Sequence, residues 1–198
     1  MDIVFDIIII VFSAILHEVS HGLAARALGD KTAEYAGRLT LNPLVHIDLY
    51  GSVIMPLFLW TISGGRFLFA YAKPVPYNPY NLKNQKWGPA FVGLAGPLTN
   101  LVLAGLMAIF IRSNYLPIGV SGFLFRVLLI NVSLAVFNMI PIPPLDGSKI
   151  LYLIVPNRYH QKINQFERYG IWVTLIFVFF FSYVLVYPIE WIVTFLVG

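Results

Sequence analysis

The pentapeptide His17-Glu18-Val19-Ser20-His21 has the residue types and spacing of a metal-dependent hydrolase. On a helix, positions i and i+4 share a face, so His17 and His21 can offer two imidazoles to one metal ion. Glu18 can then act as general base toward a metal-bound water. The pentapeptide lies in a stretch apolar enough to cross a bilayer, where ionisable side chains are costly and indicate function.

A catalytic zinc ion usually takes a third protein ligand and one water. The candidates for that ligand are His46, Asp48, Asp146 and His160. Depth separates them, because His21 and His17 lie 7 and 11 residues before the helix end at Leu28, and Asp146 lies 10 residues before Pro156. At helical rise, all three lie roughly 10–16 Å below the same membrane surface. Asp146 is therefore the predicted third ligand, although it could instead cap the helix that resumes after it.

The predicted chemistry is hydrolysis with one Zn²⁺ per chain, held by His17, His21 and Asp146. The metal lowers the pKa of its bound water toward about 7, and Glu18 accepts the proton. The oxyanion that forms needs hydrogen-bond donors. Asn100 and Asn138 are amides at apolar depth, and we expect them to be catalytic. Interhelical hydrogen bonding is the alternative role for such amides.

The composition places these residues in a membrane protein. The chain has 198 residues, of which 59% are hydrophobic and 11% charged, and its mean hydropathy is +0.79. Soluble domains are about 25% charged. With no Cys, thiolate ligands and disulfides are excluded. The pI of about 9.3 reflects scattered basic residues, which suit the cytoplasmic edge of a bilayer and predict no nucleic-acid partner.

The predicted fold is an all-α polytopic membrane protein with a small membrane-associated β element. Full spans are expected at residues 3–28, 88–111, 119–138 and 169–197. Residues 52–62 are too short for a span and predict a re-entrant helix, and the prolines at 141–144 predict a broken helix that resumes near 147. Alternation at 38–42 and 67–76 predicts the β element, beside protein or a watery cavity. Residues 73–76 could add a substrate strand or be a plain loop.

The charges predict an orientation. With four spans, nearly all Lys and Arg residues fall on one side, which the positive-inside rule makes cytoplasmic. Both termini then lie outside, and the metal ligands lie nearer the cytoplasmic surface of the cell membrane. We expect one membrane domain over residues 1–198. It has a catalytic core at 3–156, and residues 157–198 form a cytoplasmic loop and the final span.

Three motifs together resemble those of the site-2 proteases, which are intramembrane zinc metalloproteases. They are H-E-V-S-H-G at 17–22, G-P-L-T-N at 96–100 and N-M-I-P-I-P-P-L-D-G at 138–147. The resemblance is to the compact branch without a PDZ domain. It implies the zinc ligands, base and active-site amides named above, with membrane-spanning proteins as substrates. The chain departs from the branch at Leu49 and Tyr50, where a proline is expected near an Asp-Pro-x-Gly turn.

Two other functions fit parts of this pattern. A metal transporter or sensor would need ionisable residues along a path, but outside the motifs the spans hold little beyond Arg126 and Glu190. Inverted repeats, common in transporters, are not visible either. A catalytically silent scaffold of the same fold would not need Glu18, and Glu18 is present.

Overall fold

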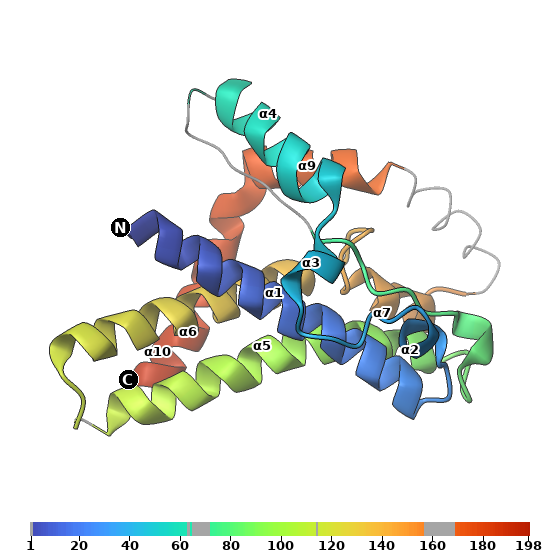
Figure 1. The fold of residues 1–198 in the computed structure, drawn as a ribbon, viewed down its shortest axis with the longest axis horizontal. Coiled ribbons are helices and arrows are strands. Elements are labelled where there is room, and N and C mark those ends of the chain that lie inside the picture. Colours follow the sequence, from blue (N-terminus) through green and yellow to red (C-terminus); the bar gives the residue numbers. More distant parts are fainter. Residues whose placement is uncertain (1, 63, 65–71, 114, 157–168) are drawn as a thin grey trace.

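The computed structural model describes residues 2–62, 64, 72–113, 115–156 and 169–198, and Figure 1 shows its arrangement of helices. Within these residues the long helices are α1 (Asp2–Ala27), α5 (Gly88–Arg112) and α6 (Ile118–Asn138). Shorter helices are α2 (Thr32–Tyr35), α3 (Pro43–His46), α4 (Met55–Ile62), α7 (Ser148–Ile154), α9 (Gly170–Phe181) and α10 (Val186–Val197). A π-helical turn η1 (Leu49–Ile54) and the 3₁₀ turns η2 (Pro79–Asn81) and η4 (Ser182–Leu185) complete the description.

Helix α5 is the centre of the fold, because it packs against both α6 and α1. The α5–α6 contact is built on Ala104 and Ala108 of α5, which face Leu128 and Val132 of α6. Small residues let two helices approach closely in a membrane, where packing rather than the hydrophobic effect drives association. Apolar side chains of α10 cover this cluster on its outer side. The three helices α1, α5 and α6 are thereby held in one bundle.

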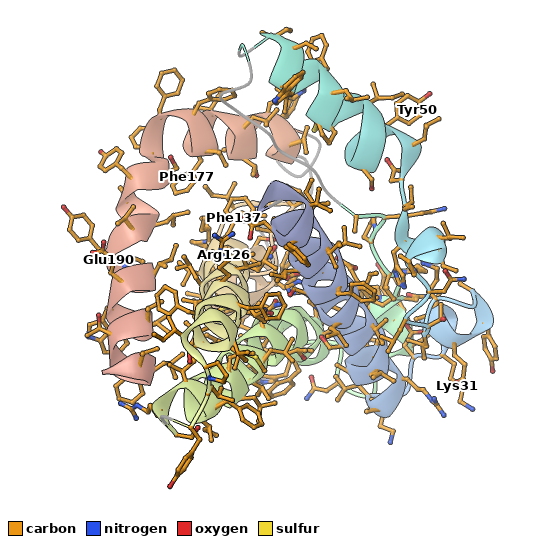
Figure 2. The ribbon with its side chains drawn as sticks, turned by 60° about the vertical axis from the view of Figure 1, so that its left-hand side comes forward. Lys31, Tyr50, Arg126, Phe137, Phe177 and Glu190 are labelled. Carbon is orange, nitrogen blue, oxygen red and sulfur yellow. The ribbon has the colours of Figure 1, made fainter. Side chains whose placement is uncertain are left out.

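The membrane class is supported by four apolar helices long enough to cross a bilayer, counted within the described residues. They begin and end within two residues of the predicted spans. The fourth, Gly170–Val197, is not straight: η4 interrupts it, and α9 and α10 lie at a wide angle to each other (Figure 2). Pro188 accounts for the break, since it cannot donate to the carbonyl of residue 184. The segment predicted as re-entrant is the short apolar pair η1–α4.

The expected β element is not seen, since no strand occurs among the described residues. Residues 38–42 are irregular, and residues 67–71 lie outside the described part of the chain. Residues 73–75 form no regular element, and their main-chain groups have partners other than a neighbouring strand. The Arg38 guanidinium donates to the carbonyls of Val45, Lys73 and Pro74, and the Val75 N–H donates to Glu18. The predicted pairing therefore fails there because the backbone has other partners.

Asp30 fastens the loop after α1 to the segment before α5. It is fully buried, and its carboxylate accepts from the N–H and hydroxyl of Thr32, the N–H of Asn78 and the amide of Asn81. Burial alone would raise the pKa of Asp30. The hydrogen bonds from Thr32, Asn81 and Asn78 outweigh it and hold the pKa below its ordinary value. Asp30 therefore stabilises the fold when it is ionised.

This arrangement predicts an acid-sensitive contribution to stability. Because the folded pKa is the lower one, the contribution is complete above the unfolded pKa of about 3.9 and is lost as pH falls through the folded value. We expect Asp30→Asn to lower the melting temperature at pH 7 and to flatten its decline below about pH 4. Thermal melts of detergent-solubilised protein from pH 7 to 3 measure this. Parallel curves for wild type and Asp30→Asn would contradict it.

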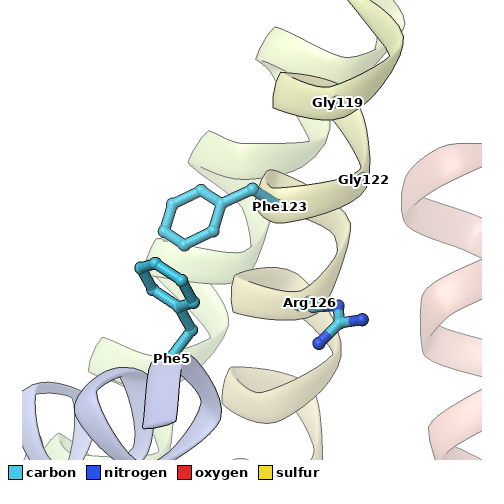
Figure 3. Close-up of a pocket in the computed structure, with 5 residues that line it drawn as sticks. All are labelled: Phe5, Gly119, Gly122, Phe123 and Arg126. Atoms are coloured by element: carbon cyan, nitrogen blue, oxygen red, sulfur yellow. The ribbon is translucent and has the colours of Figure 1, made fainter. Parts of the chain in front are cut away.

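A cavity of about 290 Å³ lies where α1 approaches α6, near the N-terminus (Figure 3). Phe5 and Phe123 line it and meet edge to face, with ring centroids 6.5 Å apart. Arg126 also lines it and forms an ion pair with Asp6, with 3.5 Å between the guanidinium nitrogen and the carboxylate oxygen. The cavity contains none of the predicted metal ligands. Arg126 pairs with an acid, as expected for a cation inside an apolar span.

Candidate metal centre

His17 and His21 lie on one face of α1, one helical turn apart, as the i, i+4 spacing requires. Both side chains are buried. Their rings meet edge to face, with centroids 4.6 Å apart and planes at 85°. In this arrangement each Nε2 atom can face the same point beside the helix.

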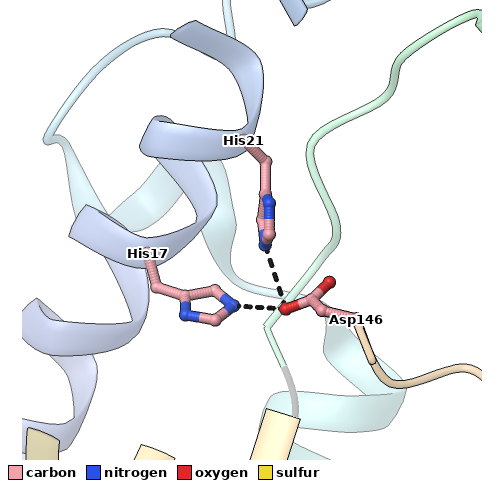
Figure 4. Close-up of side chains that lie close together, drawn as sticks. All are labelled: His17, His21 and Asp146. Carbon is pink, nitrogen blue, oxygen red and sulfur yellow. Dashed lines mark hydrogen bonds and ion pairs between the residues drawn. The ribbon is translucent and has the colours of Figure 1, made fainter. Parts of the chain in front are cut away.

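Asp146 reaches that point from the loop between α6 and α7 (Figure 4). Its Oδ2 lies 2.9 Å from His17 Nε2 and 3.2 Å from His21 Nε2. The loop is closed by a hydrogen bond of 2.7 Å from the Gly147 N–H to the Asn138 carbonyl. Helix α7 starts with Gly147 at its N-cap and has no side-chain cap. The Asp146 carboxylate therefore points to the histidines and does not cap α7.

The three side chains fit zinc in type and position. Two imidazoles and one carboxylate are a common catalytic donor set for this metal. Their ligand atoms lie within 4.8 Å of one another. Tetrahedral bonds of about 2.0–2.1 Å place ligand atoms roughly 3.3 Å apart, close to the separations seen here. The group can therefore close around one ion with small movements.

Helix α5 orients both imidazoles through their other nitrogens. His21 Nδ1 lies 2.6 Å from the Val92 carbonyl oxygen, and His17 Nδ1 lies 2.6 Å from Asn100 Oδ1. A carbonyl only accepts, so Nδ1 of His21 carries the proton and its Nε2 keeps a lone pair for a metal. Partners of this kind fix the tautomer and ring direction of metal-binding histidines. Val92 is a partner that the sequence alone did not indicate.

Gly96 leaves space for the two imidazoles. A Cβ built on this residue would lie 2.5 Å from Cε1 and Nε2 of His17 and 2.5 Å from Nε2 of His21. Any larger residue would therefore press on the two nitrogens that are predicted to bind the ion. In the sequence, Gly96 stands out only as part of the G-P-L-T-N motif. Its position one helical turn before Asn100 was the available signal, because the two residues share a face of α5.

Glu18 lies next to the ligand pair but does not join the converging group. Its Oε2 accepts a hydrogen bond of 2.9 Å from the Val75 N–H. Val75 lies between Pro74 and Pro76, and its side chain is buried against α1 close to Gly22. One oxygen of the Glu18 carboxylate is therefore held by the main chain between two prolines.

The two predicted catalytic amides have different surroundings. Asn100 is fully buried and bonds to His17, so it touches a predicted ligand. The Asn138 amide donates to the Leu134 carbonyl of its own helix at 3.0 Å, while its main-chain carbonyl closes the Asp146 loop. Their predicted role as oxyanion donors stays a prediction.

The remaining ligand candidates are placed elsewhere. His46 is buried, and its Nε2 donates to the Thr40 carbonyl at 2.8 Å. Asp48 caps η1 by accepting a hydrogen bond from the Gly51 N–H at 2.7 Å. The π-helical turn η1 includes Leu49 and Tyr50, where the family pattern has a proline. His160 lies outside the described residues. Neither His46 nor Asp48 belongs to the converging group.

The chain is similar to known proteins over most of its length. The sequence matches Peptidase family M50 over residues 5–116 and 111–182. It is 33% identical over 179 residues to "Putative zinc metalloprotease YwhC" of Bacillus subtilis, covering 86% of this chain and 78% of that protein. It is 35% identical over 142 residues to "Putative zinc metalloprotease Rip2" of Mycolicibacterium smegmatis, covering 68% and 51%. No solved structure matches the chain.

Proposed function

The chain belongs to peptidase family M50, the site-2 proteases, and is a multi-pass membrane zinc metalloprotease, from which we propose that it hydrolyses peptide bonds of membrane-spanning proteins. The observation that carries the proposal is the convergence of His17, His21 and Asp146 from two separate segments. These three residues would hold the ion. When bound, zinc polarises the scissile carbonyl and lowers the pKa of its water toward about 7.

Glu18 is the proposed general base. It takes a proton from the attacking water and then gives it to the amine that leaves. The Val75 N–H donates to Oε2 of Glu18 at 2.9 Å, which anchors the carboxylate. Asn100 and Asn138 are proposed to serve the same site, Asn100 through its contact with His17.

The substrate is a membrane-spanning helix that must first unwind. An intact helix hides its carbonyls in hydrogen bonds to residues four positions on. Residues 73–75 offer little to an incoming strand, because the Lys73 N–H bonds to His46 and Arg38 takes the Lys73 carbonyl. The Val75 N–H is held by Glu18. Helix-breaking residues near the scissile bond favour cleavage, because they help the substrate helix to unwind.

We propose that the active site lies nearer the cytoplasmic side of the cell membrane, where the positive-inside rule puts most of the Lys and Arg residues.

Reconstitution with a membrane-spanning reporter tests this function. We expect purified protein in liposomes to cleave a reporter helix that contains Gly and Pro, to stop after zinc chelation and to resume on zinc addition. A poly-Leu reporter of equal length is expected to be cleaved more slowly. A zinc-flux assay in the same liposomes tests the transporter alternative. Chelator-sensitive flux without cleavage would replace the protease function by transport.

A further inference from the structure

A chain of buried polar side chains runs from α6 through α5 to the metal centre. Asn131 of α6 contacts Asn100 of α5, and Asn100 contacts His17 of α1. Asn131 also donates to Ser13, which lies one turn before His17 on α1. Asn100 and Asn131 are fully buried, and Ser13 is 5% exposed. No family motif identified in the sequence contains Asn131 or Ser13.

The direction of each hydrogen bond along this row of polar side chains follows from one main-chain carbonyl. The Val127 oxygen can only accept, so the atom of Asn131 that lies 2.8 Å from it is the amide Nδ2. Oδ1 of Asn131 then faces Asn100 and accepts from its Nδ2 at 2.8 Å. That leaves Oδ1 of Asn100 facing His17 Nδ1 at 2.6 Å, and Nδ1 must carry the proton.

The proton on Nδ1 of His17 determines the state of the other ring nitrogen, Nε2. Because Nδ1 of His17 is the donor, Nε2 keeps the lone pair that a metal needs. Nε2 is the atom that faces Asp146 at 2.9 Å. We propose that Asn131, with Ser13, is a positioning residue of the zinc site that sets the tautomer and ring direction of His17 through Asn100. This inference rests on the zinc site of the proposed function.

Removing Asn131 releases the constraint. In Asn131→Leu, which keeps the approximate volume, the Asn100 amide loses its partner and can turn by 180°. It would then present Nδ2 to His17 and favour the tautomer whose Nε2 carries the proton. Loss of a group that orients a metal ligand weakens metal affinity about 10–100-fold, and we expect a loss in this range. Ser13→Ala keeps the hydrogen bond from Asn131 to the Val127 carbonyl, so its zinc affinity should fall by less.

The experiment measures zinc affinity by competition with a chromophoric chelator, together with the visible spectrum of the cobalt-substituted protein. Leu128→Ala is the matched control, because Leu128 is fully buried on the same helix but belongs to the apolar α5–α6 cluster. We expect it to lower the melting temperature while its zinc affinity and cobalt spectrum stay those of wild type. Ser13→Ala gives a second reading if Asn131→Leu does not fold.

The outcomes separate the two proposals. Weaker zinc binding and an altered cobalt spectrum in Asn131→Leu, with Leu128→Ala unchanged, support the positioning role. Wild-type affinity in Asn131→Leu and Ser13→Ala overturns it and leaves the protease function intact. Equal losses in Asn131→Leu and Leu128→Ala also overturn it, because loosening of α6 then explains both. A wild-type protein that binds no zinc overturns the proposed function itself.

Discussion

Glu18→Gln is expected to lower kcat for the Gly/Pro reporter by about 10²–10⁴-fold, the usual contribution of a general base. The amide oxygen of Gln can still accept from the Val75 N–H, so the contact that holds residue 18 survives. The amide cannot take a proton from water at neutral pH, which removes the catalytic step alone. Because Glu18 is not one of the converging ligands, zinc content should stay at one ion per chain.

The control for this variant is Glu34→Gln. Glu34 lies on α2, is more than a third exposed and pairs with Arg26 at 3.4 Å, so the same change in charge occurs away from the site. We expect its kcat to equal that of wild type, since exposed ion pairs contribute little. Initial rates of reporter cleavage at saturating substrate measure both variants. If Glu18→Gln cleaves at the wild-type rate with full zinc content, Glu18 is not the base.

Gly96→Ala is expected to abolish zinc binding under conditions where wild type is saturated. The added Cβ would lie 2.5 Å from Nε2 of both histidines, so the rings must move. They cannot move without loss, because Asn100 and the Val92 carbonyl hold their Nδ1 atoms. We expect zinc affinity to fall by at least about 100-fold, the upper end of what loss of a ligand's orienting partner causes. Elemental analysis after dialysis against buffered zinc measures this.

Gly105→Ala is the control on the same helix. A Cβ at Gly105 meets nothing within 4 Å. Alanine is a better helix former than glycine by about 1 kcal/mol, so this variant should be as stable as wild type or slightly more so. It should keep full zinc content and activity. Full zinc content in Gly96→Ala would show that the site relaxes more freely than its hydrogen bonds indicate.

The convergence of the three proposed ligands could be predicted because two local rules bring them together. Helical periodicity places His17 and His21 on one face, and counting residues from the span ends places Asp146 at the same depth. Both rules need only the sequence and a bilayer of known thickness. The structure brings these three residues together. Span boundaries were predictable for the same reason, since length and apolar composition set them.

The partners of these ligands could not be assigned in this way. Asn100 was selected for its depth, but its contact with His17 depends on how α5 rotates against α1. Asn131 is also an amide in an apolar span, two turns before Asn138, so its depth gave the same indication as that of Asn100. Its hydrogen-bond partners come from the three helices α1, α5 and α6, which the sequence does not reveal. The expected strand pairing failed because the Arg38 guanidinium binds the main-chain carbonyls of Val45, in α3, and of Lys73. Such choices are decided by tertiary packing.

The separation of the proposed zinc ligands along the chain affects when activity can begin. His17 and Asp146 are 129 positions apart. At synthesis rates of about 5–20 residues per second, the carboxylate emerges roughly 6–26 s after the first imidazole. Until then the nascent polypeptide lacks one of the three proposed ligands. Segments made earlier are therefore not exposed to a complete hydrolytic centre before residue 146 has been translated.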